Sequence, residues 1–234
     1  MARIYMAISI FVILVSIVAA GTVFFKVEYF AVYGNSHYTA EEIIRATGIA
    51  YDDNLFLMDK FRIIDKMMSE MIFLESVEIR RVLPGTLKIT VSEVQIAGAI
   101  ESNGEYWLCD QNGRLLEKQS TPPSNTTLIV GVTLDKPAAA KLIATEEREK
   151  QQPLLALLPA LFESGLSSGV TKISLEKIYE LTIWYGEGFE ILLGKSDSLL
   201  DKCRRLSLLL PQLQSEGRTA ARIDASGSSI HVLP

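Results

Sequence analysis

The chain has 234 residues and a mass of 25.9 kDa, which suits one large domain or two modest ones. Its net charge of −5 argues against a nucleic-acid-binding protein, because such proteins carry a basic excess. A hydrophobic content of 48% excludes a disordered chain, and two cysteines are too few for a disulfide-built scaffold. The mean hydropathy is +0.23 although 22% of the residues are charged, so we expect the apolar residues to be concentrated in one segment.

The N-terminal end contains such a segment. Residues 4–25 carry no charge and have a basic residue on either side. As an α-helix this run would rise about 33 Å, enough to cross a hydrocarbon core of about 30 Å. A cleaved signal peptide is the alternative, with residues 18–20 as the cleavage site, but the apolar part of a signal peptide is only about 7–15 residues long. We therefore predict a single transmembrane helix at 4–25, a cytoplasmic tail at 1–3, and an extracytoplasmic remainder.

Residues 26–93 are predicted to form a β-α-α-β-β unit. Val27–Tyr33 is rich in β-branched and aromatic residues, which indicates a strand. Thr39 and Glu42 have the spacing of a capping box, which predicts the start of a helix. Gly48 has the position of a glycine that ends that helix.

A second helix is predicted to begin near Asp59. Its inward stripe is expected to consist of Phe61, Ile64, Met67, Met68 and Met71. Alternating residues at 77–80 and 87–92 then predict a hairpin with one buried face around a turn at 83–86. We expect both helices to cover that face of a three-stranded sheet.

Residues 94–234 are predicted to form a mixed β domain with two or more helices, so the fold class of the whole chain is α+β. Asn112-Gly113 predicts a two-residue type I′ turn. Leu154–Phe162 indicates a helix, and Ser198 could cap a final helix with inward leucines. The expected strands lie at 96–100, 106–110, 114–116, 128–130, 170–175, 181–185, 189–194 and 221–225.

Three stretches behind the apolar segment occur in a characteristic order and spacing. They are residues 32–38 (Val-Tyr-Gly-Asn-Ser-His-Tyr), 54–59 (Asn-Leu-Phe-Leu-Met-Asp) and 77–87 (Val-Glu-Ile-Arg-Arg-Val-Leu-Pro-Gly-Thr-Leu). Together they resemble the POTRA domain of the FtsQ/DivIB family of bacterial cell-division proteins. That family usually closes the domain with a Glu-Arg-x-Pro-x-Ala run, of which this sequence keeps only Glu93 and Ala97.

The second unit also resembles that family, in the succession of its elements. A Trp-x-x-Asp-x-x-Gly hairpin at 107–113 is followed by a strand ending in Leu-Gly at 193–194, a helix, and an Ile-Asp strand at 223–224. The resemblance implies a POTRA domain at 26–93 followed by the family's β domain at 94–234. It also implies binding to the small bitopic division proteins of the FtsB/DivIC and FtsL types, and a part in controlling septal peptidoglycan synthesis.

No catalytic set, cofactor site or metal site is recognisable in the sequence. His37 falls in a predicted turn and His231 close to the end of the chain, and neither has recognisable catalytic partners. Gly186-x-Gly188 lacks the third glycine of a dinucleotide site, and no His/Cys cluster suits zinc. Cys109 and Cys203 could pair outside the cytoplasm, but buried free thiols are the expected state. We therefore expect neither an enzyme nor a cofactor.

These features favour a non-enzymatic membrane scaffold of the division machinery. We expect β-augmentation, in which a partner segment adds a strand to the open edge of the last strand. The expected partner-binding residues are Ala221, Arg222, Ile223, Asp224, Ala225, Ser226, Ile230, His231 and Val232. The alternative is that the C-terminal tail itself covers this edge.

Two other functions are open at the level of the sequence. A membrane-tethered hydrolase of the envelope would need a cleft with convergent titratable groups, which the sequence does not concentrate. A POTRA-type assembly chaperone would be expected to carry several tandem POTRA units. For the favoured scaffold we expect a location in the plasma membrane with enrichment at the septum, and neither a nucleic acid nor a small-molecule substrate as partner.

Overall fold

The computed structural model describes residues 2–177, 179–227 and 229–233. It divides into two compact units, Met1–Val94 and Gln95–Pro234. The first unit begins with helix α1, Ala2–Phe24, which includes two residues of the expected tail, while Met1 lies outside the described residues. Within the part of the chain that is described, no helix combines the length and apolarity needed to cross a membrane. The transmembrane segment therefore stays a prediction.

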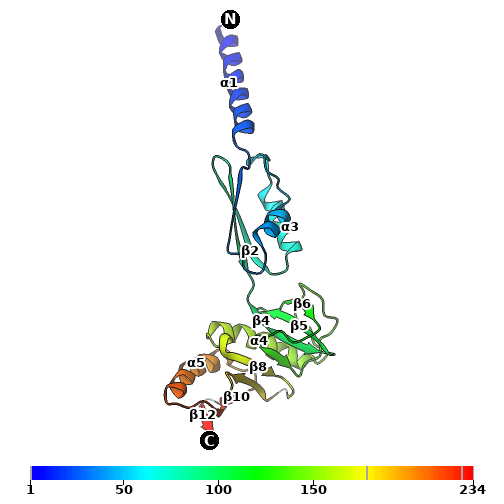
Figure 1. Ribbon diagram of the computed structural model, residues 1–234, viewed down its shortest axis with the longest axis vertical. Helices are drawn as coiled ribbons and strands as arrows, with labels where there is room; N and C mark the ends of the chain where they lie inside the picture. Colours follow the sequence, from blue (N-terminus) through cyan, green and yellow to red (C-terminus); the bar gives the residue numbers. More distant parts are fainter. Residues whose placement is uncertain (1, 178, 228, 234) are drawn as a thin grey trace. The chain divides into compact units, whose positions relative to one another are not determined.

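The rest of the first unit has the predicted order β-α-α-β-β (Figure 1). Its sheet has the strand order β1-β3-β2, with β1 parallel to β3 and β2 antiparallel to β3. The buried side chains of β3 pack with Ile43 and Met67 from the two helices, so the expected single buried face is confirmed. The elements are β1 Tyr29–Tyr33, α2 Ala40–Thr47, α3 Lys60–Glu70, β2 Leu74–Val82 and β3 Thr86–Glu93.

Local sequence determines where the two helices of this unit begin. Thr39 and Glu42 form the predicted capping box, and Gly48 ends α2 with a left-handed φ of 69°. Asp59 accepts hydrogen bonds from the first backbone N–H groups of α3. Phe61, in contrast, is 70% exposed, so its assignment to the inward stripe was wrong. It lies in the first turn of α3, before the turn that contributes the buried Met67.

Glu93 at the end of β3 holds the turn after β1. Its carboxylate accepts hydrogen bonds from the backbone N–H groups of Ser36 (3.0 Å), His37 (2.6 Å) and Tyr38 (3.1 Å). Partial burial raises the pKa of Glu93, but the three hydrogen bonds outweigh it and hold the pKa below its usual value. His37 also stacks on Phe73 with a centroid distance of 3.9 Å, so the histidine has a structural place in this turn.

The second unit is built on one nine-stranded mixed sheet (Figure 1). Its strand order is β12-β11-β10-β9-β8-β7-β4-β5-β6. The strands are β4 Ile96–Ser102, β5 Glu105–Asp110, β6 Leu115–Gln119, β7 Leu128–Val130, β8 Val170–Ser174, β9 Leu181–Tyr185, β10 Phe189–Gly194, β11 Ala221–Asp224 and β12 His231–Leu233. The helices are α4 Arg148–Glu163, a short 3-10 turn at Ser167–Gly169, and α5 Leu199–Ser215.

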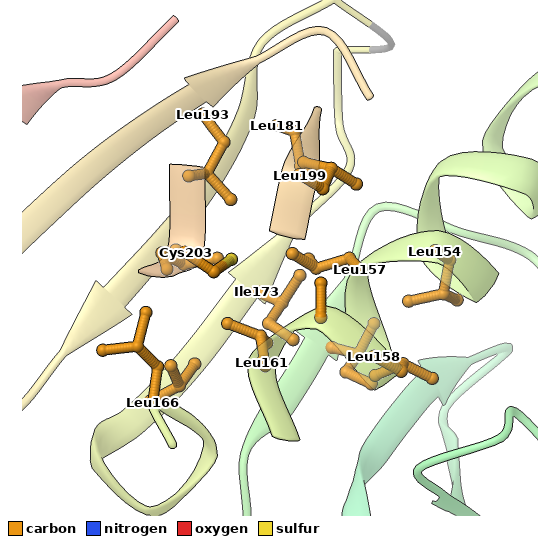
Figure 2. Packing of buried hydrophobic residues seen from close by; sticks show 14 of the residues in the cluster. Leu154, Leu157, Leu158, Leu161, Leu166, Ile173, Leu181, Leu193, Leu199 and Cys203 are labelled. Carbon is orange, nitrogen blue, oxygen red and sulfur yellow. The ribbon is translucent and has the colours of Figure 1, made fainter. Parts of the chain in front are cut away.

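Two helical crossovers join parallel strands in this sheet and supply its core. α4 connects β7 to β8, and α5 connects β10 to β11. Figure 2 shows leucines of α4 gathered around Ile173 of β8, with Cys203 of α5 close to Leu193 of β10. The apolar residues of both helices therefore pack with the strands in one cluster, as expected from the sequence.

Three local predictions in this unit need correction. The β5–β6 connection is not a two-residue type I′ turn, because residues 111–114 separate the strands. Asp110 holds this loop by accepting the N–H groups of Asn112 and Arg114 on its Oδ1. α4 begins at Arg148, earlier than the apolar run suggested. Ser198 has a left-handed φ of 52° and its side chain forms no capping hydrogen bond.

Lys202 in α5 is an unexpected member of the interior. Its side chain is 3% exposed. The Nζ atom donates to the backbone oxygens of Leu193 (2.9 Å) and Lys195 (3.2 Å), and lies 3.7 Å from Asp197. A buried ammonium group with these partners is satisfied, and it ties the end of β10 to the helix that follows.

Candidate functional site

The open edge of the nine-stranded sheet belongs to β12. β11 pairs in parallel with β10 on one side and antiparallel with β12 on the other. The expectation that Ala221 to Ser226 present an open edge was therefore wrong, and the alternative that the tail covers this edge is what the structure shows. Among the described residues β12 pairs with no further strand, so the exposed edge has moved outward by one strand.

The hydrogen bonds of β11 determine which groups of β12 are free. Ala221 donates its backbone N–H to the oxygen of Gly188, directly before β10, and Ala225, directly after β11, donates to the oxygen of Leu192 in β10. Because successive residues of a strand point their backbone groups in opposite directions, Arg222 and Asp224 face β12.

The pairing of β11 with β12 carries this pattern to the outer strand. Asp224 is opposite His231, and Arg222 is opposite Leu233. His231 and Leu233 therefore use their backbone groups for β11, whereas the N–H and C=O groups of Val232 point away from the sheet. The open edge thus offers a main-chain donor and acceptor at Val232.

The predicted partner-binding residues differ in exposure. Ile223 and Ala225 are fully buried, so their side chains cannot contact a partner, and Ile230 and Val232 pack against the same core. The exposed members are Arg222, Ser226 and His231, while Asp224 and Ala221 are half-buried. Leu233, which the sequence did not single out, is 41% exposed and belongs to the same edge.

A small polar cluster accompanies this edge. Ser226 donates its backbone N–H to Asp224 Oδ1 at 2.9 Å. Hydrogen bonds from the Ser226 hydroxyl and N–H lower the pKa of Asp224, and the nearby His231 and Arg222 act in the same direction. Because Asp224 and His231 are opposite each other in the β11–β12 ladder, this cluster favours the docked position of the tail.

The opposite edge of the sheet, at β6, is covered at its start by the chain itself. Leu115 donates its N–H to the oxygen of Lys141 at 2.7 Å and accepts the N–H of Ala140 at 2.8 Å. Ile143 donates to the oxygen of Gly113 at 2.8 Å. The loop at 138–143 therefore occupies the start of β6, where a partner strand would otherwise pair.

The same unit contains a polar cavity of about 610 Å³ at the ends of β4, β7 and β8. Lys150 on its wall donates to the oxygen of Gly131 at 2.6 Å and lies 3.6 Å from Glu147. Glu147 in turn accepts the N–H of Thr133, and this hydrogen bond lowers the pKa of the carboxylate. Lys150 and Glu147 are thus paired with groups of the protein itself, and the lining also includes Glu101, Lys172 and Glu176.

The cysteines have no features of reactive groups. Cys109 and Cys203 are free and buried. Burial raises the pKa of Cys109 to about 12 and that of Cys203 to about 11, which keeps both thiols protonated at neutral pH. The described residues include no cluster of His, Cys, Asp and Glu that could hold a metal ion.

Comparison with known families matches the first unit after α1 and most of the second unit. Residues 25–93 match the FtsQ-type POTRA domain. Residues 98–226 match the C-terminal domain of the cell division proteins FtsQ and DivIB. The chain belongs to the FtsQ/DivIB family. The matched part of the second unit stops at Ser226, so β12 lies beyond it.

Individual relatives in the FtsQ/DivIB family are distant. Cell division protein DivIB of Clostridium acetobutylicum is 22% identical over 212 residues, covering 90% of this chain and 84% of the relative. Cell division protein FtsQ of an Anaeromyxobacter species is 30% identical over 196 residues, covering 80% of this chain and 63% of the relative. The solved major extracytoplasmic domain of DivIB from Geobacillus stearothermophilus, at 17% identity, superposes with a TM-score of 0.36 over 53% of this chain and 97% of that domain.

Proposed function

We propose that this FtsQ/DivIB protein is a non-enzymatic, single-pass membrane scaffold that binds other division proteins at the septum through its extracytoplasmic units. The partners we propose are the small bitopic proteins of the FtsB/DivIC and FtsL types. By binding them the protein would help to control septal peptidoglycan synthesis. The family assignment supports a role in cell division, and the open edge at β12 carries the proposal of how a partner is bound.

Strand addition at β12 is the proposed mode of binding. The outward N–H and C=O groups of Val232 would pair with one extended segment of a partner, and the sheet would gain a tenth strand. The side chains on the outer face of this edge, Arg222, His231 and Leu233, would contact alternate side chains of that segment. This arrangement assigns the main-chain contact to Val232 on β12, one of the residues expected from the sequence, and not to residues 221–226 on β11.

Anchoring by residues 4–25 is the proposed basis of the membrane location. The segment has no charged residue and forms most of α1. As a continuous helix these 22 residues would rise about 33 Å, against a hydrocarbon core of about 30 Å, and the C-terminal end of α1 leads directly into the first folded unit. The N-terminus would be cytoplasmic and both folded units extracytoplasmic.

The test compares two substitutions at Val232. Val232→Pro removes the outward N–H, and proline is tolerated on an edge strand whose N–H faces solvent. Val232→Ala shortens the same side chain but keeps the N–H, so it is the matched control. We expect affinity for the DivIC-type partner, measured with purified proteins, to fall at least about tenfold for Val232→Pro relative to Val232→Ala. Equal affinities of these two variants would contradict strand addition at β12.

A further inference from the structure

The loop between α2 and α3 is attached to the end of α1. Asn54 Nδ2 donates to the backbone oxygen of Gly21 at 3.1 Å, and Leu55 donates its N–H to the oxygen of Phe25 at 2.8 Å. The rings of Phe25 and Phe56 meet edge to face with centroids 5.1 Å apart. These contacts hold the loop beside the last turn of α1.

The level of this loop along α1 follows from those contacts. Gly21 lies four residues before Phe25, which corresponds to a rise of about 6 Å along a helix. Asn54 therefore reaches about one helical turn back from the end of the apolar segment. If the C-terminal end of α1 lies at a membrane surface, residues 54–57 therefore lie at that surface too.

Large apolar side chains are exposed at this end of the first unit. Leu57 is 77% exposed and Phe56 is 53% exposed. Leu83, in the turn between β2 and β3, is 54% exposed. This turn lies at the same end, because the oxygen of Gly85 accepts the N–H of Glu28 at 2.7 Å. Phe56, Leu57 and Leu83 are named here the juxtamembrane patch.

Basic groups accompany the juxtamembrane patch. The guanidinium group of Arg81 lies 5.8 Å from the centre of the Phe56 ring, and its Nη2 donates to the oxygen of Met58 at 3.0 Å. Lys26 follows the apolar segment directly and lies 3.7 Å from Asp52. Aromatic, leucine and basic side chains at one level are the residue types that lie in the boundary between lipid headgroups and acyl chains.

We propose that the juxtamembrane patch inserts into the headgroup region of the bilayer that holds α1, so that the first unit rests on the membrane. The inference rests on the proposed membrane anchor, because α1 sets the depth of the loop. Lipid is favoured over a protein partner as occupant, because the hydrogen bonds to Gly21 and Phe25 place the loop beside the final turn of the apolar helix. Insertion would also shield the side chains of Phe56 and Leu57 from water.

The test measures the depth of single fluorescent labels in the full-length chain reconstituted into phosphatidylcholine vesicles. NBD is attached at Leu57→Cys, Glu75→Cys or Ser16→Cys, and quenching by a lipid spin-labelled near the top of its acyl chain is recorded. The native thiols are buried and protonated, so unsubstituted protein serves as the labelling background. Glu75 is exposed near the start of β2, and about 23 Å of strand separate it from Val82 at the other end.

We expect the label at Leu57 to be quenched at least about twofold more than the label at Glu75, because interfacial insertion reaches only about 5–10 Å. A label at Leu83→Cys should be quenched as strongly as the one at Leu57. Agreement between the two positions shows that the quenching does not result from a local distortion by one substitution. Equal quenching at Leu57 and Glu75, with strong quenching at Ser16, would overturn the inference and leave the membrane anchor intact. Absence of quenching at Ser16 would overturn the anchor and the inference together.

Discussion

The two edges of the nine-stranded sheet are treated in opposite ways. At β6 the loop at 138–143 forms backbone hydrogen bonds with both groups of Leu115, and charged residues follow along the strand. At β12 nothing among the described residues pairs with the outer groups of Val232. Exposed strand edges promote unwanted pairing, and charged side chains such as Glu117 and Lys118 discourage it. The comparison teaches that the two edges differ in protection: the start of β6 is paired and its remainder carries charge, whereas β12 has neither feature among the described residues.

The largest expected effect comes from breaking the closed edge. Asp110 has a side chain only 3% exposed, and it holds the β5–β6 loop through Asn112 and Arg114. We expect Asp110→Ala to lower the free energy of unfolding by about 2–3 kcal/mol, because several buried hydrogen bonds and an ion pair are lost. Urea unfolding measures this change, and faster hydrogen exchange at Leu115 would report that the edge has opened.

Asp224→Ala at the other edge is the matched control for that experiment. Asp224 also accepts a backbone N–H two residues later, but it is far more exposed than Asp110. We expect its removal to cost less than about 1 kcal/mol of the free energy of unfolding. A larger loss for Asp224→Ala than for Asp110→Ala would reverse the comparison between the two edges.

A smaller effect, the rate of amide hydrogen exchange along β12, tests the open edge without any mutation. The N–H groups of His231 and Leu233 face β11, whereas that of Val232 faces solvent. We expect the Val232 amide to exchange its hydrogen at least about tenfold faster than the other two, because only those two are protected by the ladder. Amide exchange followed by NMR checks this pattern. Similar rates at all three positions would show that the register of β12 differs from the one described.

The smallest expected effect is the dependence of the β12 edge on pH. The pKa of Asp224 is lowered in the folded protein, chiefly by hydrogen bonds from Ser226, so its carboxylate contributes stability above its unfolded pKa of about 3.9. That contribution is lost as the pH falls through the lowered folded value. We expect the Ser226 amide resonance to follow this transition in an acid titration, and the transition to disappear in Asp224→Asn. A pH-independent Ser226 resonance in the unsubstituted protein would contradict this account.

What the sequence could predict depends on the range of the interactions involved. The capping box of Thr39 and Glu42 and the buried face of β3 were predicted correctly, because both are patterns within a few residues. Phe61 was misplaced because helical spacing identifies the inward face but not the turn at which the helix first meets the core, and Phe61 lies in the first turn, before the buried Met67. Lys202 could not be placed in the interior, since its partners Leu193 and Lys195 are backbone oxygens brought to it by the packing of α5 on β10.

The candidate site was predicted in part for the same reason. The sequence pointed to residues 221–232 as the partner-binding segment, which stays a prediction, and the alternative that the tail covers the edge is the arrangement that the structure shows. β12 has only three residues, too few for an alternating pattern, so it could not be identified as a strand beforehand. The outward direction of Val232 depends on hydrogen bonds between β10 and β11, which are contacts between segments separated by a whole helix.

The parallel pairing of β1 with β3 has a mechanical consequence. α1 leads into the start of β1, and the chain leaves this unit directly after Glu93 at the end of β3. The two strands run side by side in the same direction. A force that pulls the start of β1 away from the end of β3 therefore slides one strand along the other. Sliding loads all the hydrogen bonds of the pair at once, whereas peeling would break them one at a time. A pulling force between α1 and the residues after Glu93 would therefore load the β1–β3 hydrogen bonds in shear.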